Sequence, residues 1–171
     1  MSRLNIFQII SFFIYLFYQV LILKNIVLFH TAFCFLYIGY LLLLPVESNS
    51  IILMLIGFVL GFSVDVFYDS LGLHAFACVF IMYIRNYWLN SITPQGGYDS
   101  GSIPSMNMSG VQWFVIYSLP LVFIHHLLVF YIEAGGFGLF WFTLWKVGTS
   151  TVFTMLAILI AQFLFPYRRR L

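Results

Sequence analysis

Residues 51–68 read IILMLIGFVLGFSVDVFY, an apolar run in which Asp65 is the one charged side chain. The hydrocarbon core of a bilayer is about 30 Å thick and takes roughly 20 helical residues to cross. A run of this length and composition therefore predicts a transmembrane helix. Further apolar blocks of similar length fill most of the remaining chain, so the sequence leaves no room for a water-soluble domain.

The apolar blocks predict an all-α integral membrane protein, a single transmembrane domain over residues 1–171 with six transmembrane helices. The helices are expected at about 4–23, 26–44, 51–68, 73–89, 111–133 and, in the last block, 137–165. Residues 90–109 are rich in Gly, Ser, Pro and Asn and predict a loop.

The last apolar block is longer than a bilayer core, because residues 137–165 would form a helix of about 43 Å. Either this helix is strongly tilted, or residues 137–145 lie along the membrane interface and the spanning part begins near residue 147. Trp141 and Trp145 favour the second arrangement, since tryptophan is enriched at membrane interfaces.

Composition excludes several classes of protein. Hydrophobic residues make up 63% of the chain and charged residues 7%, with a mean hydropathy of +1.06, which is too apolar for a soluble globule. The runs are continuously apolar and do not alternate, which excludes a transmembrane β-barrel. A net charge of +2 is too small to indicate nucleic acid. Cys34 and Cys78 lie within apolar runs, which indicates small hydrophobic fillers.

The positions of Lys and Arg predict the orientation in the membrane. With both termini in the cytoplasm, Arg3, Arg85 and the cluster at 168–170 fall on the inner side, and Lys24 and Lys146 fall on the outer side. Because cytoplasmic loops carry the excess of basic residues, this orientation is the favoured one. It places the loop at 90–109 in the cytoplasm.

In this orientation the ionisable residues of several helices converge near the outer face. The predicted polar cluster consists of Asp65, Asp69, His74, His125, Glu133 and Lys146. Two interpretations stay open: the groups are caps and mutual partners that hold the helices together, or they line a pocket for a ligand, a proton or a partner helix. Asp65 is expected to pair with Lys146 or Arg85, and Arg85 to extend its long side chain to the cytoplasmic surface.

Three stripes of small or polar residues predict packing surfaces. Gly57 and Gly61 precede Asp65 at four-residue spacing, and Ser150 and Thr154 share a face of the last helix, so both pairs indicate close helix packing. The first helix has a polar face formed by Gln8, Ser11, Tyr15 and Tyr18. This face is the predicted docking site for the transmembrane helix of another protein.

Motifs for catalysis are not found in the sequence. The segment 61–65 lacks the closing glycine of a nucleophile elbow, and there is no His-Glu-x-x-His zinc motif. His125 and His126 are adjacent, so on a helix they point about 100° apart. We therefore expect neither an enzyme nor a bound cofactor or metal.

One stretch resembles a known family: Asp65-x-x-x-Asp69-x-Leu71-Gly72-x-His74-Ala75. Further landmarks follow in the same order along the chain, namely Arg85, the pair His125-His126, Glu133-Ala134 and a last apolar helix that ends in arginines. Together they resemble the rod shape-determining protein MreD family, over essentially the whole chain.

The resemblance implies a non-enzymatic subunit of the bacterial cell-elongation complex in the cytoplasmic (inner) membrane. Members of the family bind the bitopic protein MreC and, through it, a wall-synthesising transglycosylase and transpeptidase, with the actin-like MreB below. Their six-helix bundle is similar to the substrate-binding subunits of energy-coupling-factor transporters. We expect a scaffold that binds MreC and helps direct peptidoglycan synthesis. The alternative is a small-molecule-binding subunit of a membrane transporter.

Overall fold

The computed structural model describes residues 6–99 and 101–165. Its elements are α1 (Ile6–Leu21), the 3₁₀ turn η1 (Leu23–Asn25), β1 (Val27–Leu28), β2 (Ala32–Phe33), α2 (Tyr37–Leu42), α3 (Ser50–Tyr68), α4 (Leu73–Ser91), α5 (Met106–Ser109), α6 (Val111–Glu133) and α7 (Phe140–Leu164). The chain is mostly helical, and four segments are long and apolar enough to cross a bilayer: Ile6–Asn25, Ser50–Tyr68, Val111–Glu133 and Phe140–Leu164. These features are those of a membrane-embedded, all-α protein.

Local signals explain where α3 and α4 begin and end. The side chain of Asn49 accepts a hydrogen bond from the Ile51 N–H at 2.8 Å and caps the start of α3. Asp69 ends α3 in the left-handed conformation, with a φ of 58°, and Gly72 precedes α4 with a φ of 91°. The two helices are therefore joined by a tight turn and lie within two residues of the positions expected from sequence.

The predicted helix over residues 26–44 does not form. In its place β1 and β2 pair as an antiparallel hairpin, with Val27 opposite Phe33 and Leu28 opposite Ala32. The chain then runs extended to the short helix α2, all of whose residues are buried. Hydropathy cannot distinguish this broken segment from a helix, because both are equally apolar.

The last apolar block forms one helix. α7 begins at Phe140 and continues unbroken to Leu164, so residues 140–164 form one helix without a break near residue 147. At about 1.5 Å per residue α7 is roughly 37 Å long, which exceeds the hydrocarbon core. A tilted span and an interfacial first part of this helix both stay predictions.

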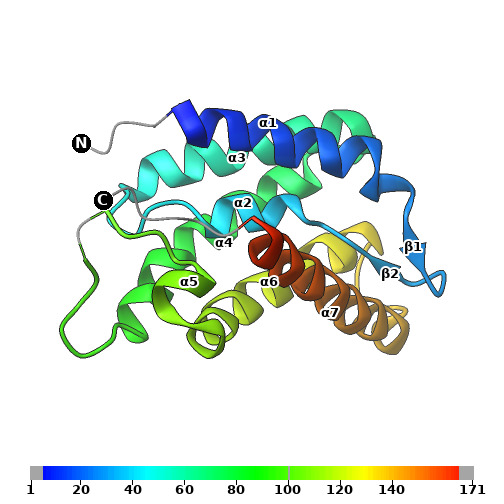
Figure 1. The fold of residues 1–171 in the computed structure, drawn as a ribbon. Coiled ribbons are helices and arrows are strands. Elements are labelled where there is room, and N and C mark those ends of the chain that lie inside the picture. The colour runs from blue at the N-terminus through cyan, green and yellow to red at the C-terminus, as the bar shows by residue number, and fades with distance from the viewer. Residues whose placement is uncertain (1–5, 100, 166–171) are drawn as a thin grey trace.

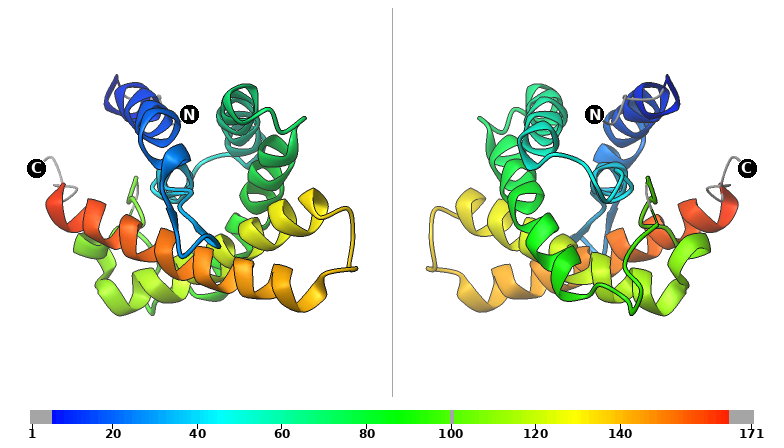
Figure 2. Two further views of the ribbon diagram at one scale, coloured as in Figure 1. Left: turned by 90° about the vertical axis from the view of Figure 1, so that its right-hand side faces the viewer. Right: turned by 90° about the vertical axis from the view of Figure 1, so that its left-hand side faces the viewer.

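The helices form two layers that cross at a large angle. α1 and α3 lie side by side and appear end-on in Figure 2, where α6 and α7 are seen along their length. α4 contacts both α3 and α6 and so links the layers. The extended segment and α2 lie in the interior between them (Figures 1 and 2).

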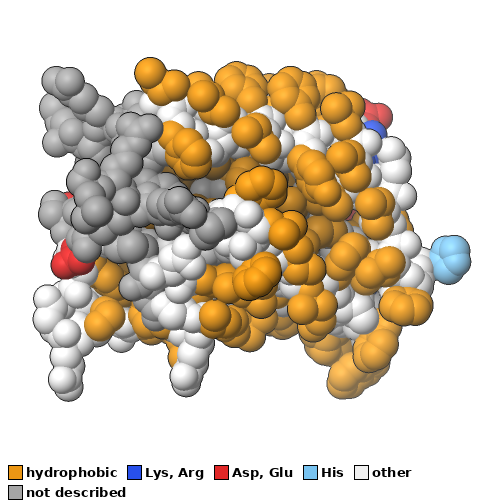
Figure 3. Space-filling model, in the orientation of Figure 1, with side chains coloured by type: hydrophobic (Ala, Val, Ile, Leu, Met, Phe, Trp, Pro, Cys, Tyr) orange, Lys and Arg blue, Asp and Glu red, His pale blue; other side chains and the backbone are white. Residues whose placement is uncertain are grey.

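The connections gather at two ends of the molecule. β1, β2, the α3–α4 turn and the α6–α7 turn lie at one end, which we call the hairpin end, on the right of Figure 1. α1, α3 and α6 run toward this end, whereas α2, α4 and α7 run away from it. The face shown in Figure 3 is covered largely by hydrophobic side chains, as expected for contact with lipid.

The predicted loop at 90–109 is partly packed against the helices. α4 extends to Ser91, and α5 forms a short helix just before α6. The Val46 N–H donates to the Ser102 carbonyl at 3.0 Å, and the Tyr98 hydroxyl donates to the Leu89 carbonyl at 3.0 Å. The Met106 N–H also donates to Gln162 Oε1 on α7 at 2.9 Å, so this connection is held to the bundle at several points.

Candidate functional site

Part of the predicted polar cluster meets around a residue that the sequence did not single out, Tyr37. The Tyr37 hydroxyl lies 2.8 Å from His74 Nδ1 on α4 and 2.8 Å from His125 Nε2 on α6. A hydroxyl donates a single hydrogen, so at most one of the two imidazoles accepts from Tyr37 and at least one donates to it. The Cys78 sulfur lies 3.8 Å from the same His125 nitrogen. All four side chains are buried.

The neighbouring histidine faces a different helix. His126 Nδ1 lies 2.8 Å from the Val122 carbonyl, and its Nε2 lies 3.1 Å from Thr154 Oγ1 on α7. A carbonyl oxygen only accepts, so Nδ1 carries the hydrogen and the Nε2 of the neutral ring accepts from Thr154. The two adjacent histidines therefore connect α6 to α4 on one side and to α7 on the other.

Asp65 binds backbone groups and not a cation. Its carboxylate accepts from the N–H groups of His74 at 3.0 Å and Ala75 at 2.8 Å, and from the Ser70 hydroxyl at 2.6 Å. These backbone groups are unpaired donors of the first turn of α4, so Asp65 caps that helix from α3. The predicted pairing of Asp65 with Lys146 or Arg85 is wrong, because Lys146 pairs with Glu133 and Arg85 binds the Tyr117 hydroxyl and the Leu44 carbonyl.

Glu133 and Lys146 form a separate pair at the surface. Lys146 Nζ lies 2.8 Å from Glu133 Oε2, and it also lies 4.2 Å from the ring centre of Phe130 and 4.7 Å from that of Phe33. The pair joins α6 to α7, and Lys146 also contacts Phe33 of the hairpin. Asp69 is exposed at the end of α3. The structure therefore divides five of the six predicted residues among the Tyr37 cluster, the α4 cap and this surface pair, and leaves Asp69 apart from all three.

The extended segment, residues 33–37 from the end of β2 to the start of α2, has backbone N–H and carbonyl groups that form hydrogen bonds with side chains of two distant helices, α1 and α7. Gln19 on α1 donates from Nε2 to the Cys34 carbonyl at 2.9 Å and to the Tyr68 hydroxyl at 2.8 Å, and its Oε1 lies 3.4 Å from the Tyr37 N–H. From α7, Ser150 accepts from the Phe33 N–H and Thr154 from the Phe35 N–H, both at 3.0 Å. Non-helical backbone inside a membrane protein needs such internal partners, since lipid offers none.

Arg85 binds the chain just after α2, at the C-terminal end of residues 26–44. Its guanidinium donates to the Leu44 carbonyl just after α2, and its Nε donates to the Tyr117 hydroxyl at 2.7 Å. Tyr117 in turn donates to the Leu42 carbonyl at 3.0 Å. The prediction that Arg85 reaches the surface is wrong, because the Leu44 carbonyl and the Tyr117 hydroxyl bind it in the interior, where it is fully buried.

The predicted packing residues lie where backbones approach closely. A Cβ added to Gly61 would lie 2.6 Å from Ala75 Cα, and one added to Gly57 would lie 3.1 Å from the Cys78 carbonyl oxygen. Both glycines thus allow α4 to pack directly on α3. Ser150 and Thr154 act differently from the prediction, because their hydroxyls bind the extended segment as well as packing beside it.

The polar face of α1 does not form a free docking surface. Gln8 is buried, Ser11 and Tyr15 are half-buried, and the Tyr15 ring lies 6.2 Å from that of Tyr40 inside the bundle. Tyr18 alone of the four is exposed. Tyr40 of α2 lies against Tyr15, so part of this face is occupied within the chain, and its role in docking a partner helix stays a prediction.

A groove lies on the outer surface between α3 and α4. Its volume is about 760 Å³, and it is lined by Phe58, Phe62, Asp65, Val66, Asp69, Leu71, Gly72, Ala75, Phe76 and Val79. Phe58 and Phe62 stack on one wall with ring centres 5.9 Å apart, and Phe76 stands on the other wall. The floor is shallow because Gly61 brings Ala75 close to α3.

Sequence reasoning missed Gln19, Tyr37 and Tyr117. Gln19 carried a weak signal, since an amide in an apolar run needs a partner. The two tyrosines carried none, because tyrosine is common in apolar helices. Among the residues that the structure describes, no three His, Cys, Asp or Glu side chains are arranged to hold a metal ion.

Comparison with known proteins does not assign the chain to a family: no protein-family model, curated protein or solved structure matches it.

Proposed function

We propose that this protein is a non-enzymatic membrane scaffold that seats the transmembrane helix of a bitopic partner in the groove between α3 and α4. The resemblance to the MreD family supplies the partner, MreC, and the role, which is to help direct peptidoglycan synthesis during cell elongation. The transglycosylase, the transpeptidase and MreB would be reached through MreC. The proposal takes the chain as a six-pass protein of the inner membrane with both termini in the cytoplasm.

One observation carries the proposal: several buried polar side chains, Gln19, Asp65 and Arg85 among them, bind other side chains or the backbone, and the groove presented to the membrane is lined mainly by apolar side chains. A catalytic or transport site needs polar groups that are open to a substrate. Asp65 is the clearest example, because its oxygens already accept three hydrogen bonds.

The shape of the groove suits a helix. From Phe58 to Asp69 the α3 wall extends about 16 Å, or three helical turns. Aromatic walls beside a floor of Gly72 and Ala75 form a socket into which Leu or Ile side chains of a second helix can insert. Phe58, Phe62 and Phe76 are each about half exposed, so they are available to such a partner.

The alternative function, capture of a small molecule, has one observation in its favour. His125 is fully buried, and its Nδ1 has no hydrogen-bond partner in the structure. A polar ligand beside this atom would complete the Tyr37 cluster. Native mass spectrometry of the gently purified protein separates the two functions, because a retained small molecule supports capture and co-purified MreC supports the scaffold.

The test of the scaffold is recovery of MreC with the tagged full-length chain from membranes. The variant Phe58→Ala/Phe62→Ala removes one wall of the groove and is expected to lower recovery of MreC about tenfold. The matched control, Phe17→Ala/Phe163→Ala, makes the same change at exposed positions of α1 and α7 outside the groove and should leave recovery unchanged. Equal recovery with both variants would refute the proposed site.

A further inference from the structure

The tip of the β1–β2 hairpin is strained and exposed. The Thr31 N–H donates to the Leu28 carbonyl at 3.1 Å, and the two residues between them, Phe29 and His30, have φ values of 51° and 57°. This turn normally takes Asn-Gly, since a side chain in the left-handed conformation costs roughly 1–2 kcal/mol per residue. Phe29 is 90% exposed, so contacts within the described chain do not offset the strain.

The base of the hairpin is fixed to the bundle. Phe33 donates its N–H to Ser150 Oγ at 3.0 Å, and Lys146 lies over its ring. On the other side Lys24 Nζ donates to the Phe67 carbonyl at 2.5 Å and lies 5.4 Å from the ring centre of Tyr68. The strained tip is therefore held out from the helices in a defined position.

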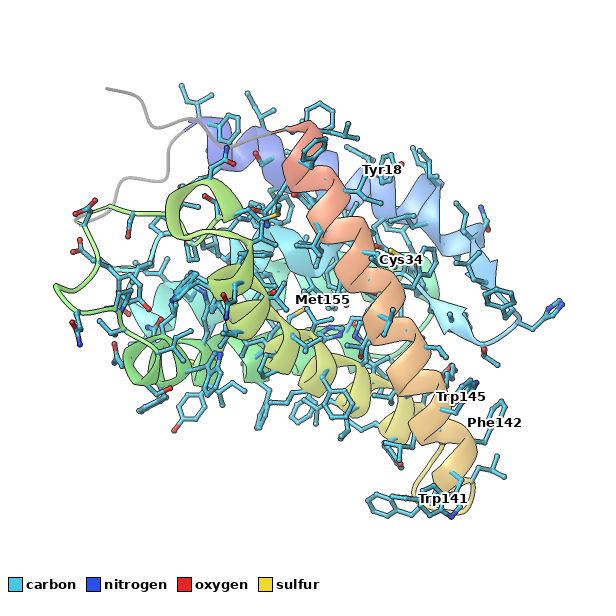
Figure 4. All side chains as sticks on the ribbon, turned by 60° about the horizontal axis from the view of Figure 1, so that its bottom comes forward. Tyr18, Cys34, Trp141, Phe142, Trp145 and Met155 are labelled. Carbon is cyan, nitrogen blue, oxygen red and sulfur yellow. The ribbon has the colours of Figure 1, made fainter. Side chains whose placement is uncertain are left out.

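A second aromatic projection lies at the same end of the molecule. Trp141 and Trp145 stand one turn apart at the start of α7 and are 79% and 66% exposed, with Phe137 just before them (Figure 4). α7 exceeds the hydrocarbon thickness by several residues, and the first turns of the helix carry the two indoles. An indole suits the boundary between lipid chains and water, because it combines a large apolar ring with one N–H donor.

We propose that Phe29 and the pair Trp141 and Trp145 are two anchors in the headgroup interface of the bilayer at the hairpin end. The partner is lipid, since these three side chains are exposed and apolar, and the adjoining ends of α1 and α7 expose further apolar side chains such as Leu21 and Phe142. The Lys146–Glu133 ion pair lies near the same level, as expected for a boundary with water. Two anchors on different elements hold the depth of the bundle and the tilt of α7. This inference concerns lipid contact and does not depend on the proposed binding of MreC.

The test is depth-dependent quenching of tryptophan fluorescence by brominated phospholipids, with the full chain in vesicles of phosphatidylcholine and phosphatidylglycerol. Trp88 and Trp113 are replaced by Phe, and one indole at a time is left at position 141 or 145 or introduced as Phe29→Trp. Bromine near the headgroup should quench these three positions at least about twofold more than bromine near the bilayer centre. Val152→Trp, at an exposed position near the middle of α7, is the deep control and should show the reverse.

A second measurement covers the case in which the variants fold poorly. In the otherwise native chain, Trp141→Phe/Trp145→Phe changes only exposed side chains and should reduce the quenching by bromine near the headgroup, with the half-buried Trp88 and Trp113 at the opposite end supplying the remainder. The inference is overturned if the indole of Phe29→Trp or of Trp145 has the fluorescence of an indole in water and is quenched neither by bromine near the headgroup nor by bromine near the bilayer centre. It is equally overturned if these positions show the same depth profile as Val152→Trp.

Discussion

The side chain of Gln19 holds the backbone of Cys34: its Nε2 donates to the Cys34 carbonyl at 2.9 Å across the interior of the bundle. The same amide reaches Tyr68 and the N–H of Tyr37. Gln19 thus forms hydrogen bonds with the non-helical backbone just before α2, within the region 26–44 that was expected to be a helix.

Replacing Gln19 with Leu should destabilise the protein. The change keeps the volume but leaves the Cys34 carbonyl and the Tyr37 N–H without partners in the interior, and we expect a loss of about 2 kcal/mol in the free energy of unfolding. Unfolding in mixed micelles with increasing denaturing detergent measures it. The control is Tyr18→Phe on the exposed side of α1, which should change little. Equal stability of the two variants would contradict the role given to Gln19.

Three glycines should respond to alanine in a graded order set by the space around them. Gly61→Ala must push the backbone of α4 away and should lose about 3 kcal/mol or more, whereas Gly57→Ala is less crowded and should lose less. At Gly148 a new Cβ meets nothing within 4 Å, so Gly148→Ala should gain up to about 1 kcal/mol from helix propensity. Thermal unfolding of the three variants gives the order, and a loss at Gly148 as large as that at Gly61 would contradict the packing described.

The cap on α4 predicts a difference between the two aspartates of the α3–α4 turn. Asp65→Ala removes the acceptor for the His74 and Ala75 N–H groups and should cost about 2 kcal/mol, with Asp65→Asn between it and the native chain. Asp69→Asn should be nearly neutral, because Asn also accepts the left-handed conformation of an exposed cap.

The same pair of variants also has a cellular readout. Because the cap fixes the start of α4 beside the groove, Asp65→Ala should reduce recovery of MreC and give rounded cells, whereas Asp69→Asn should preserve rods. If cells with Asp65→Ala at normal protein level keep a full rod shape, the cap on α4 is not needed for the proposed function.

The sequence predicted the long helices closely, but it did not predict that residues 26–44 form a hairpin and a short helix. Residues 51–68 form α3 within one residue, because a long apolar run with few charged groups has one stable form in lipid. Residues 26–44 look the same by hydropathy. What changes their structure is a set of hydroxyl and amide partners at Gln19, Ser150 and Thr154, the last two more than a hundred residues away in sequence.

The candidate site was foreseen only in outline. The structure brings His74 and His125 together, as the expected order of helices suggested, but through Tyr37, which no spacing rule singles out. Asp65 and Arg85 were assigned charged partners because both are costly in a membrane. In the structure each binds backbone groups at a helix end. The Leu44 carbonyl that Arg85 binds follows α2, an end that cannot be located before the break in the second segment is known, whereas the start of α4 that Asp65 caps was expected at residue 73.

The most direct test of the central claim is photo-crosslinking in cells from the floor and wall of the α3–α4 groove. A photoreactive phenylalanine analogue is placed at Phe62, with the exposed position Phe163 on α7 as the matched control. The account predicts a covalent adduct with MreC from position 62 and none from position 163. No adduct at position 62 at normal protein level, or equal adducts at both positions, would contradict it.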